Sequence, residues 1–239
     1  MWAKFIKDIS EAATFISVRD QSSFNYLTKL GVKKAFLSKD VVFYYIKNHE
    51  NEIKLLKRNK AERKVVGLAI RCSEISRDIL DYYIPRLIEE LLNNNYHLLF
   101  LPATDGDLNL LKGYLTSLSP PLRHRITLVE STEPKVLIRS IAHLDVLISL
   151  RLHFLPFALA IGTPIVGIDF PEKVKAFCVE AGIPICHIRD TRCIVAEVQR
   201  IVRTLNSDSS TISKHVLDKN INDLLRNIDL FKKKTLKLL

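Results

Sequence analysis

The stretch from Val146 to Phe177 reads VLISLRLHFLPFALAIGTPIVGIDFPEKVKAF. It contains two apolar runs rich in branched residues, each followed at once by a helix-like segment, which indicates buried parallel strands joined by helices. Arg151 and His153 lie where the first strand ends, and Lys173 lies just after the second. In open α/β sheets, ligands bind outside the carboxyl ends of the strands, where the next helix presents its free N–H groups. We therefore expect an anion to bind at this edge.

The alternation of strand-like and helix-like segments continues on both sides of this stretch. Strands are expected at 64–70 (KVVGLAI), 97–103 (HLLFLPA), 126–130 (ITLVE), 146–150 (VLISL), 164–169 (PIVGID) and 185–190 (ICHIRD). Helices are expected after them at 75–92, 108–118, 134–142, 152–161, 172–181 and 193–205. Strand–helix units in this order predict an α/β fold with a doubly wound parallel sheet over 46–205. The strands are apolar throughout rather than alternating, which is typical of burial on both faces.

The two ends of the chain follow other patterns. Within 1–45 we expect a helix at 3–13, a short strand at 15–18, a helix at 22–30 and a second short strand at 35–37. Two short strands make a poor independent sheet, so this segment is interpreted as the end of a larger lobe. At the other end, 206–239 is predicted to be a Ser-rich linker (206–213) followed by a basic amphipathic helix.

Composition narrows the class of protein. The chain has 239 residues, 47% of them hydrophobic and 26% charged, as in ordinary globular proteins. No apolar run approaches the ~18 residues that span a bilayer, and the charged N-terminus does not resemble a signal peptide, so we expect a cytoplasmic protein. The four cysteines form no CxxC pair, so no metal site is expected.

The net charge of +10 raises the question of an anionic partner. The basic runs at 54–64 and 232–237 lack the interleaved aromatic residues that stack on bases, so we expect solvated faces and no nucleic-acid binding. The amphipathic tail leaves open a peripheral contact with an anionic membrane surface.

Several side chains that bind anions follow predicted strands. Arg19 follows a short strand in the N-terminal segment, and Arg71 follows the strand at 64–70. Together with Arg151 and His153 they favour an anion pocket, because guanidinium groups bind carboxylate and phosphate in a bidentate manner. Histidine is the natural proton carrier of this group because it titrates near neutral pH.

The loop PATDGD (102–107) adds two carboxylates to this edge. Asp105 and Asp107 are interpreted either as contacts to a sugar hydroxyl or as caps of the next helix, and the sequence favours neither. The sequence contains no GxGxxG, GxxxxGK[ST] or GxSxG motif, which weakens dinucleotide, P-loop and serine-hydrolase interpretations.

Four segments, in this order, resemble the polysaccharide pyruvyl transferase family. They are ISVRDQSSFNYLTKLGVKKAFLSKDVVF (16–43), VGLAIR (66–71), LFLPATDGD (99–107) and the run 133–184 that contains RLHFLPFALAIGTPIVGIDFPEKV. The resemblance covers about residues 10–205, and its most specific part is RLH followed by IGTPIVGIDFPEKV.

The resemblance implies a glycosyltransferase-B-like fold of two Rossmann-like domains. It also implies transfer of pyruvate from phosphoenolpyruvate to a cell-envelope sugar or lipid-linked saccharide as a ketal, without a cofactor. Arg19, His153 and Lys173 match positions important for activity in the family, and Arg151 and Arg71 are further anion contacts. Members of the family begin with a whole Rossmann-like domain that carries a Gly-rich loop, whereas this sequence starts just ahead of the VRD motif.

We therefore expect a truncated N-terminal lobe and a site that needs a partner chain or a homo-oligomer to be complete. Two other hypotheses stay open. One is a glycosyltransferase-B-type half that binds a nucleotide-sugar, with the RLH segment holding a diphosphate at a helix N-terminus. The other is a non-catalytic remnant or interaction module.

Overall fold

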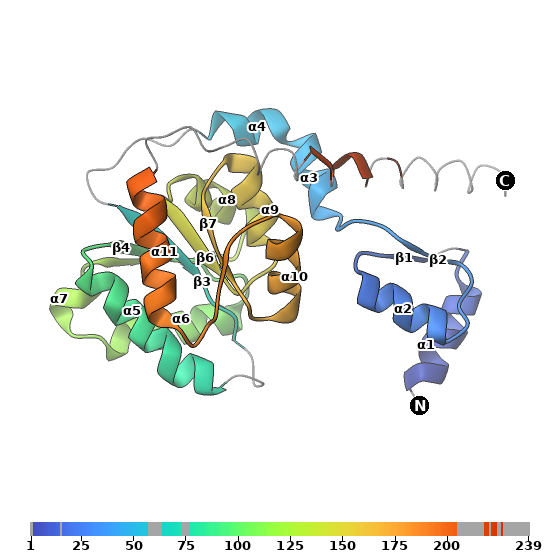
Figure 1. Cartoon of the computed structure of the whole chain (residues 1–239), viewed down its shortest axis with the longest axis horizontal. Helices are drawn as coiled ribbons and strands as arrows, with labels where there is room; N and C mark the ends of the chain where they lie inside the picture. The colour runs from blue at the N-terminus through green and yellow to red at the C-terminus, as the bar shows by residue number, and fades with distance from the viewer. Residues whose placement is uncertain are drawn as a thin grey trace. The chain divides into compact units, whose positions relative to one another are not determined.

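The computed structural model describes residues 2–14, 16–56, 64–72, 77–204, 218–219, 221–223 and 226. The chain forms two compact units, one made of Met1–Asn48 with Leu217–Leu239 and the other of His49–Val216, each with its own sheet (Figure 1). The predicted Ser-rich linker, most of the predicted C-terminal helix and most of the basic run 54–64 lie outside the described residues. That 1–45 is the end of a larger lobe stays a prediction.

The larger unit contains a parallel sheet whose strand order is β5-β4-β3-β6-β7-β8. Its strands are β3 (Val65–Ala69), β4 (His97–Phe100), β5 (Ile126–Leu128), β6 (Val146–Ser149), β7 (Ile165–Ile168) and β8 (Ile185–Cys186). The chain builds outward from β3 through β4 to β5, and then returns to place β6 on the other side of β3. This reversal makes the boundary between β3 and β6 the topological switch point, outside which ligands bind in open α/β sheets.

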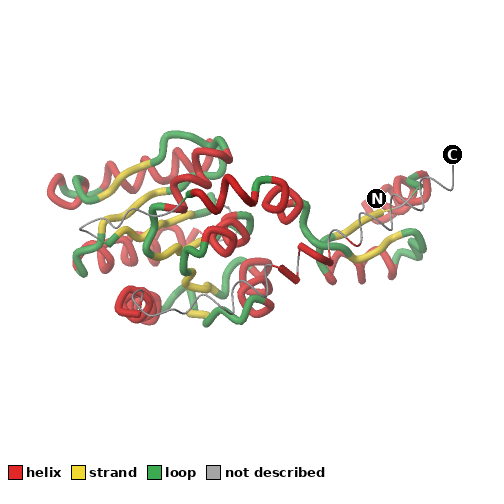
Figure 2. Tube along the Cα trace, turned by 90° about the horizontal axis from the view of Figure 1, so that it is seen from above, coloured by secondary structure: helices red, strands yellow, loops and turns green. Residues whose placement is uncertain are grey.

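Helices cover both faces of this sheet, as Figure 2 shows for the larger unit. One face carries α5 (Ile84–Asn93), α6 (Asp105–Ser117) and α11 (Thr191–Thr204); the other carries α8 (Pro134–Ala142), α9 (Phe154–Ile161) and α10 (Glu172–Glu180). Short helices α4 (Glu50–Leu55) and α7 (Pro120–Arg123) complete the unit, and a π-helical turn, η2 (Ile79–Tyr83), precedes α5. The expected doubly wound parallel sheet is confirmed.

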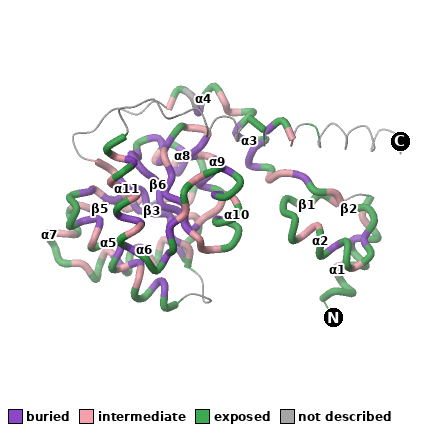
Figure 3. The backbone as a smooth tube through the Cα atoms, viewed as in Figure 1, coloured by how far each residue is buried: buried purple, intermediate pink, exposed green. Residues whose placement is uncertain are grey.

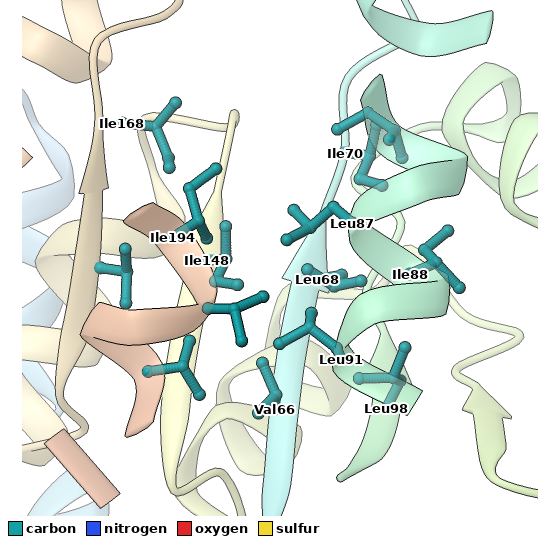
Figure 4. Close-up of a cluster of buried hydrophobic side chains, with 14 of the residues drawn as sticks. Val66, Leu68, Ile70, Leu87, Ile88, Leu91, Leu98, Ile148, Ile168 and Ile194 are labelled. Atoms are coloured by element: carbon teal, nitrogen blue, oxygen red, sulfur yellow. The ribbon is translucent and has the colours of Figure 1, made fainter. Parts of the chain in front are cut away.

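Two hydrophobic cores follow from the alternation of side chains along the strands. Val66 and Leu68 of β3 pack with α5 and α11 in the core drawn in Figure 4. Ala69 of the same strand faces the second core, which α8, α9 and α10 complete. Strands β6 and β7 are buried along their whole length, and Figure 3 shows the buried chain gathered in the middle of the sheet. The strands can be apolar throughout because both faces are covered.

The smaller unit has a parallel pair of strands, β1 (Ile16–Val18) and β2 (Ala35–Leu37). Its helices are α1 (Trp2–Ala12), α2 (Gln21–Lys29) and α3 (Val42–Asn48). Asp20 caps α2, since its Oδ1 accepts a hydrogen bond from the Ser23 N–H at 2.7 Å. Among the described residues, no helix is long and apolar enough to cross a membrane.

Three parts of the fold differ from the sequence predictions. Helices α3, α4 and α7 were not expected at all. The strand expected at 185–190 contains only Ile185 and Cys186, because the chain then turns and the Asp190 N–H donates to the His187 carbonyl oxygen at 2.9 Å. The helix expected at 75–92 takes a π-helical form over Ile79–Tyr83 before it becomes α5.

Candidate functional site

The corner after β6 is held by a short hydrogen-bonded turn. The buried Ser149 hydroxyl donates to the Arg151 carbonyl oxygen at 2.8 Å and accepts from the Arg151 N–H at 3.0 Å. The Leu150 N–H donates to the Ala69 carbonyl oxygen at 2.8 Å, which extends the pairing of β3 and β6 by one residue. This turn ends the strand and directs the RLH segment out of the carboxyl edge of the sheet, beside the switch point.

His153 lies at the N-cap position of α9 and is exposed. Its backbone is helical and its side chain makes no capping hydrogen bond to α9. The helix behind it is strongly apolar and is anchored by the buried Phe154 and Leu155. The buried residues therefore anchor the backbone that carries His153, while the imidazole itself is exposed to solvent and solutes.

Asp107 is fully buried at the same edge and contacts the chain segments that follow three strands. Its Oδ1 accepts from the Cys72 N–H at 2.8 Å, and its Oδ2 accepts from the Ala103 N–H at 3.1 Å. The Arg151 guanidinium completes the set, because Nη2 forms an ion pair with Oδ1. The carboxyl ends of β3, β4 and β6 are therefore tied to one carboxylate.

Thr104 begins α6 as its N-cap. Its Oγ1 accepts from the Asp107 N–H at 3.3 Å and from Arg151 Nη2 at 3.3 Å. Asp105 follows in the first turn of α6 and is exposed, so it faces solvent where Asp107 does not. Arg151 is 22% exposed, and its Nε is buried without a hydrogen-bond partner within the described part of the chain.

Lys173 lies in the first turn of α10, after β7, and is exposed. Asp169, between β7 and this helix, accepts from the Ile188 N–H at 2.9 Å and lies 3.4 Å from Nε2 of His187. Arg71 follows β3 and is half-buried. Each of these residues lies beyond the carboxyl end of a strand of the larger sheet.

Arg19 follows β1 and belongs to the smaller unit. Its Nη1 forms an ion pair with Asp40, a residue that follows β2, and the Asp40 Oδ1 accepts from the Val42 N–H at 3.1 Å. Arg19 therefore lies at the carboxyl edge of its own small sheet.

A further ion pair joins two helix starts of the larger unit. Arg189, just before α11, contacts Asp78 at 2.7 Å and lies 5.9 Å from the ring centre of Tyr83. The hydrogen bond from this guanidinium lowers the pKa of Asp78 from its ordinary value, and the same bond raises the pKa of Arg189. This pair connects the chain after β8 to the beginning of η2.

Comparison with known proteins gives the family. The family model for polysaccharide pyruvyl transferase matches residues 3–170, well over half of the chain. The chain belongs to the polysaccharide pyruvyl transferase family. The matched region of this family member contains Arg19, Arg71, Arg151 and His153, and it ends three residues before Lys173.

Solved structures of glycosyltransferases share the fold of this pyruvyl transferase family member. A glycosyltransferase from Rickettsia africae has a TM-score of 0.65 at 10% identity, with 98% of this chain and 67% of that chain covered. Sucrose-phosphate synthase from Thermosynechococcus elongatus has a TM-score of 0.64 at 14% identity, with 97% and 61% covered. Anabaena HepE, solved with UDP-glucose, has a TM-score of 0.58 at 14% identity, with 95% and 64% covered.

These likenesses establish a glycosyltransferase-B-like fold and nothing more specific. The chain spans about half to two thirds of the length of the solved structures it matches. No curated protein sequence is similar enough to count as a match.

The structure brings some of the predicted site residues together. Arg151 and Asp107 are in direct contact, and Asp105 lies two residues from Asp107 at the start of α6. Lys173 and Arg71 lie on the same carboxyl edge of the larger sheet, whereas Arg19 is described only within the smaller unit. In the described part of the chain, no group of three or more His, Cys, Asp or Glu residues is placed to hold a metal ion.

Sequence reasoning missed the partners of these residues. Asp40 was not predicted as the partner of Arg19, and the Asp169–His187 pair was not predicted either. One signal was present for both aspartates, because each closely follows an apolar run that forms a strand. The partner itself depends on which strands become neighbours, and that is a property of the fold.

Proposed function

We propose that the chain transfers pyruvate from phosphoenolpyruvate to two hydroxyl groups of a cell-envelope saccharide and so forms a cyclic ketal. The observation that carries this proposal is the family match, which includes the RLH segment at the switch point of the sheet. The exposed His153 at the start of α9 and the cationic residues on the same carboxyl edge of the sheet are groups of the kinds that the reaction needs.

The donor sets the first requirement, because phosphoenolpyruvate carries a carboxylate and a phosphate. More than one cation must hold it before it reacts. Arg71 and Lys173 supply positive charge on the carboxyl edge of the larger sheet. The N-terminus of α9 adds a positive helix dipole to the same corner.

Proton transfer sets the second requirement. A proton is added to the methylene carbon of the enol, and positive charge develops on the neighbouring carbon, which the first sugar hydroxyl attacks. The carbon–oxygen bond to phosphate breaks, phosphate leaves with the bonding electrons, and the second hydroxyl closes the ring while both hydroxyl protons are released. His153 is suited to these transfers as acid and then as base, and the neighbouring cations stabilise the departing phosphate.

The test is pyruvyl transfer to a set of glycosides, followed by phosphate release and by mass spectrometry of the ketal. His153→Ala is expected to lower turnover about 10²- to 10⁴-fold, the range for loss of a general acid or base. His124→Ala is the matched control, because His124 is also exposed but lies before β5, at the opposite edge of the sheet. Equal turnover of the two variants would show that His153 has no such role.

A second candidate function is suggested by the fold. Anabaena HepE has been solved with UDP-glucose, and a glycosyltransferase-B-like half could hold a nucleotide-sugar at the N-terminus of α9. Thermal unfolding separates the two hypotheses, because a ligand that binds only the folded state raises the midpoint. Stabilisation by phosphoenolpyruvate favours pyruvyl transfer, and stabilisation by UDP or GDP favours the nucleotide-sugar hypothesis. If none of these ligands raises the midpoint, the result favours a non-catalytic module.

Acceptor and location are also proposals. A lipid-linked saccharide as acceptor agrees with a peripheral contact between the basic tail and an anionic membrane surface on the cytoplasmic side. Association with a second chain or a further copy of this chain belongs to the same proposal.

A further inference from the structure

Asp107 is the most deeply buried charged group at the carboxyl edge. It is 0% exposed, and its contacts are the N–H groups of Cys72 and Ala103 and the guanidinium of Arg151. A buried carboxylate is tolerated when a charge pairs with it and hydrogen bonds satisfy its oxygens. The arrangement fulfils both conditions entirely with groups of the protein, so no part of this carboxylate is needed to bind a sugar hydroxyl.

The same contacts restrict what Arg151 can do. A guanidinium offers two edges for bidentate recognition, one formed by Nε and Nη2 and the other by Nη1 and Nη2. Both edges include Nη2, and its two N–H groups are directed to Asp107 Oδ1 and to Thr104 Oγ1. In this arrangement Arg151 cannot hold a carboxylate or phosphate of the donor in a bidentate manner, and because Nε is buried, only a single contact through Nη1 is left to it.

The contact instead fixes the backbone of the RLH corner. Arg151 is two residues from His153, and its main chain is held by Ser149 while its side chain is held by Asp107. The side chain of Arg151 therefore attaches this segment to Thr104 and Asp107 after β4, the Leu150 N–H attaches it to Ala69 of β3, and the bonds with Ser149 shape the turn itself.

We propose that Asp107 is a positioning residue that acts through Arg151 to set the place of His153. On this assignment, bidentate binding of the donor falls to another cation, and Arg71 is the arginine available on the same edge of the larger sheet. This proposal rests on the proposed pyruvyl transfer. It assigns Asp107 and Arg151 to the positioning of His153 and not to the binding of the donor.

The decisive comparison is between Asp107→Asn and Asp145→Asn. Asp145 is also 0% exposed and accepts from the Val65 N–H at 2.7 Å, but it lies at the amino ends of β3 and β6. Both variants lose one buried charge that accepts a hydrogen bond from the backbone at one end of β3, and only Asp107→Asn changes the edge that carries His153. Activity is expressed per folded molecule, with the folded fraction taken from circular dichroism.

The expected result is a split between turnover and donor binding. Asp107→Asn should lower kcat about 10- to 100-fold, as small displacements of catalytic groups do, and should leave the Kd for phosphoenolpyruvate within about threefold of the wild type. Arg151→Lys should give the same split, since it keeps the charge and loses the link to Asp107. Asp145→Asn should leave both quantities near the wild-type values. An increase of about tenfold or more in Kd with Arg151→Lys, together with normal kcat in Asp107→Asn, would overturn the proposal.

A second arm uses no substrate. The variants Asp107→Ala, Arg151→Ala and the double variant form a cycle in urea unfolding, and coupling that changes the folding equilibrium at least about tenfold is expected for a direct ion pair. Additive effects would show that Asp107 does not hold Arg151, and the positioning role would fall. A further outcome is coupling between Asp107 and Arg151 while the wild type neither binds nor consumes phosphoenolpyruvate. In that case the ion pair stands, but the proposed function and the catalytic role of this positioning both fail.

Discussion

Gly67 in the middle of β3 lies very close to Leu144, which belongs to the connection between α8 and β6. A Cβ placed on Gly67 would lie 2.3 Å from Cδ1 of Leu144, a side chain that is 1% exposed. Ordinary contact begins at 3.4 Å, so Leu144 would have to withdraw by about 1.1 Å within a closed core. We expect Gly67→Ala to lower the free energy of unfolding by about 1–3 kcal/mol, the usual cost of overpacking.

A compensating variant makes this prediction specific. Leu144→Ala alone should cost about 2–5 kcal/mol, because it removes a buried side chain and leaves a cavity. In the double variant the new methyl group at position 67 occupies part of that cavity, so its total cost should be smaller than the sum of the single costs by about 1–3 kcal/mol. Urea unfolding followed by far-ultraviolet circular dichroism measures all three variants. Additive costs within about 0.5 kcal/mol would refute the reasoning, since they would mean that the two side chains do not compete for one space.

Two further predictions concern stability. Gly113 is exposed within α6, and a methyl group added there would have no atom within 4 Å. Because alanine favours the helix more than glycine does, Gly113→Ala should stabilise the protein by about 0.5–1 kcal/mol and raise the thermal midpoint. A lower midpoint would contradict the helical assignment. Burial raises the pKa of Cys178 from 9.0 to about 11, so the stability that its thiol contributes is complete below pH 9 and is lost, by up to about 3 kcal/mol, as the pH rises toward 11. Urea unfolding across that range should show a shallower decline for Cys178→Ala than for the wild type, and equal declines would contradict the assignment.

The fold of the larger unit was predictable because its signals are local. Strands that are buried on both faces must be apolar along their length, and the runs at β3, β6 and β7 satisfy this rule in the sequence itself. Helices α5, α8 and α11 are recognisable because their apolar residues recur with the helical period. Helices α3 and α4 escaped prediction, since neither is longer than seven residues and short helices carry less than two turns of pattern.

The candidate site was predictable only in part. The placement of Arg151 and His153 after a strand follows from the sequence, because the strand and its end are local features. The role of Asp107 does not, since its partners Cys72 and Arg151 lie 35 and 44 residues away in the chain. Only the strand order brings these residues together, which is why sugar contact and helix cap were equally good interpretations of the same aspartate.

A buried carboxylate lies beyond each end of the β3–β6 pair, since Asp145 directly precedes β6 and Asp107 reaches the other end from the start of α6. At a switch point the loops leave neighbouring strands in opposite directions, so backbone N–H groups at the strand ends lose the partners that a continuous ladder would provide. Asp145 accepts from the Val65 N–H at one end and Asp107 accepts from the Cys72 N–H at the other.

The counter-charges of these two aspartates differ in a way that matters for function. Asp145 faces Lys64, a flexible side chain that is 40% exposed and 3.4 Å away, whereas Asp107 faces the planar guanidinium of Arg151, which is 22% exposed. A lysine ammonium can move without breaking a shaped contact, but an arginine held through one nitrogen by two acceptors has a defined orientation. Both aspartates therefore accept hydrogen bonds from backbone N–H groups. Only Asp107, at the carboxyl end, also orients an arginine that lies two residues from the exposed His153. The shaped contact of Arg151 at the carboxyl end is thus what the proposed positioning of His153 uses.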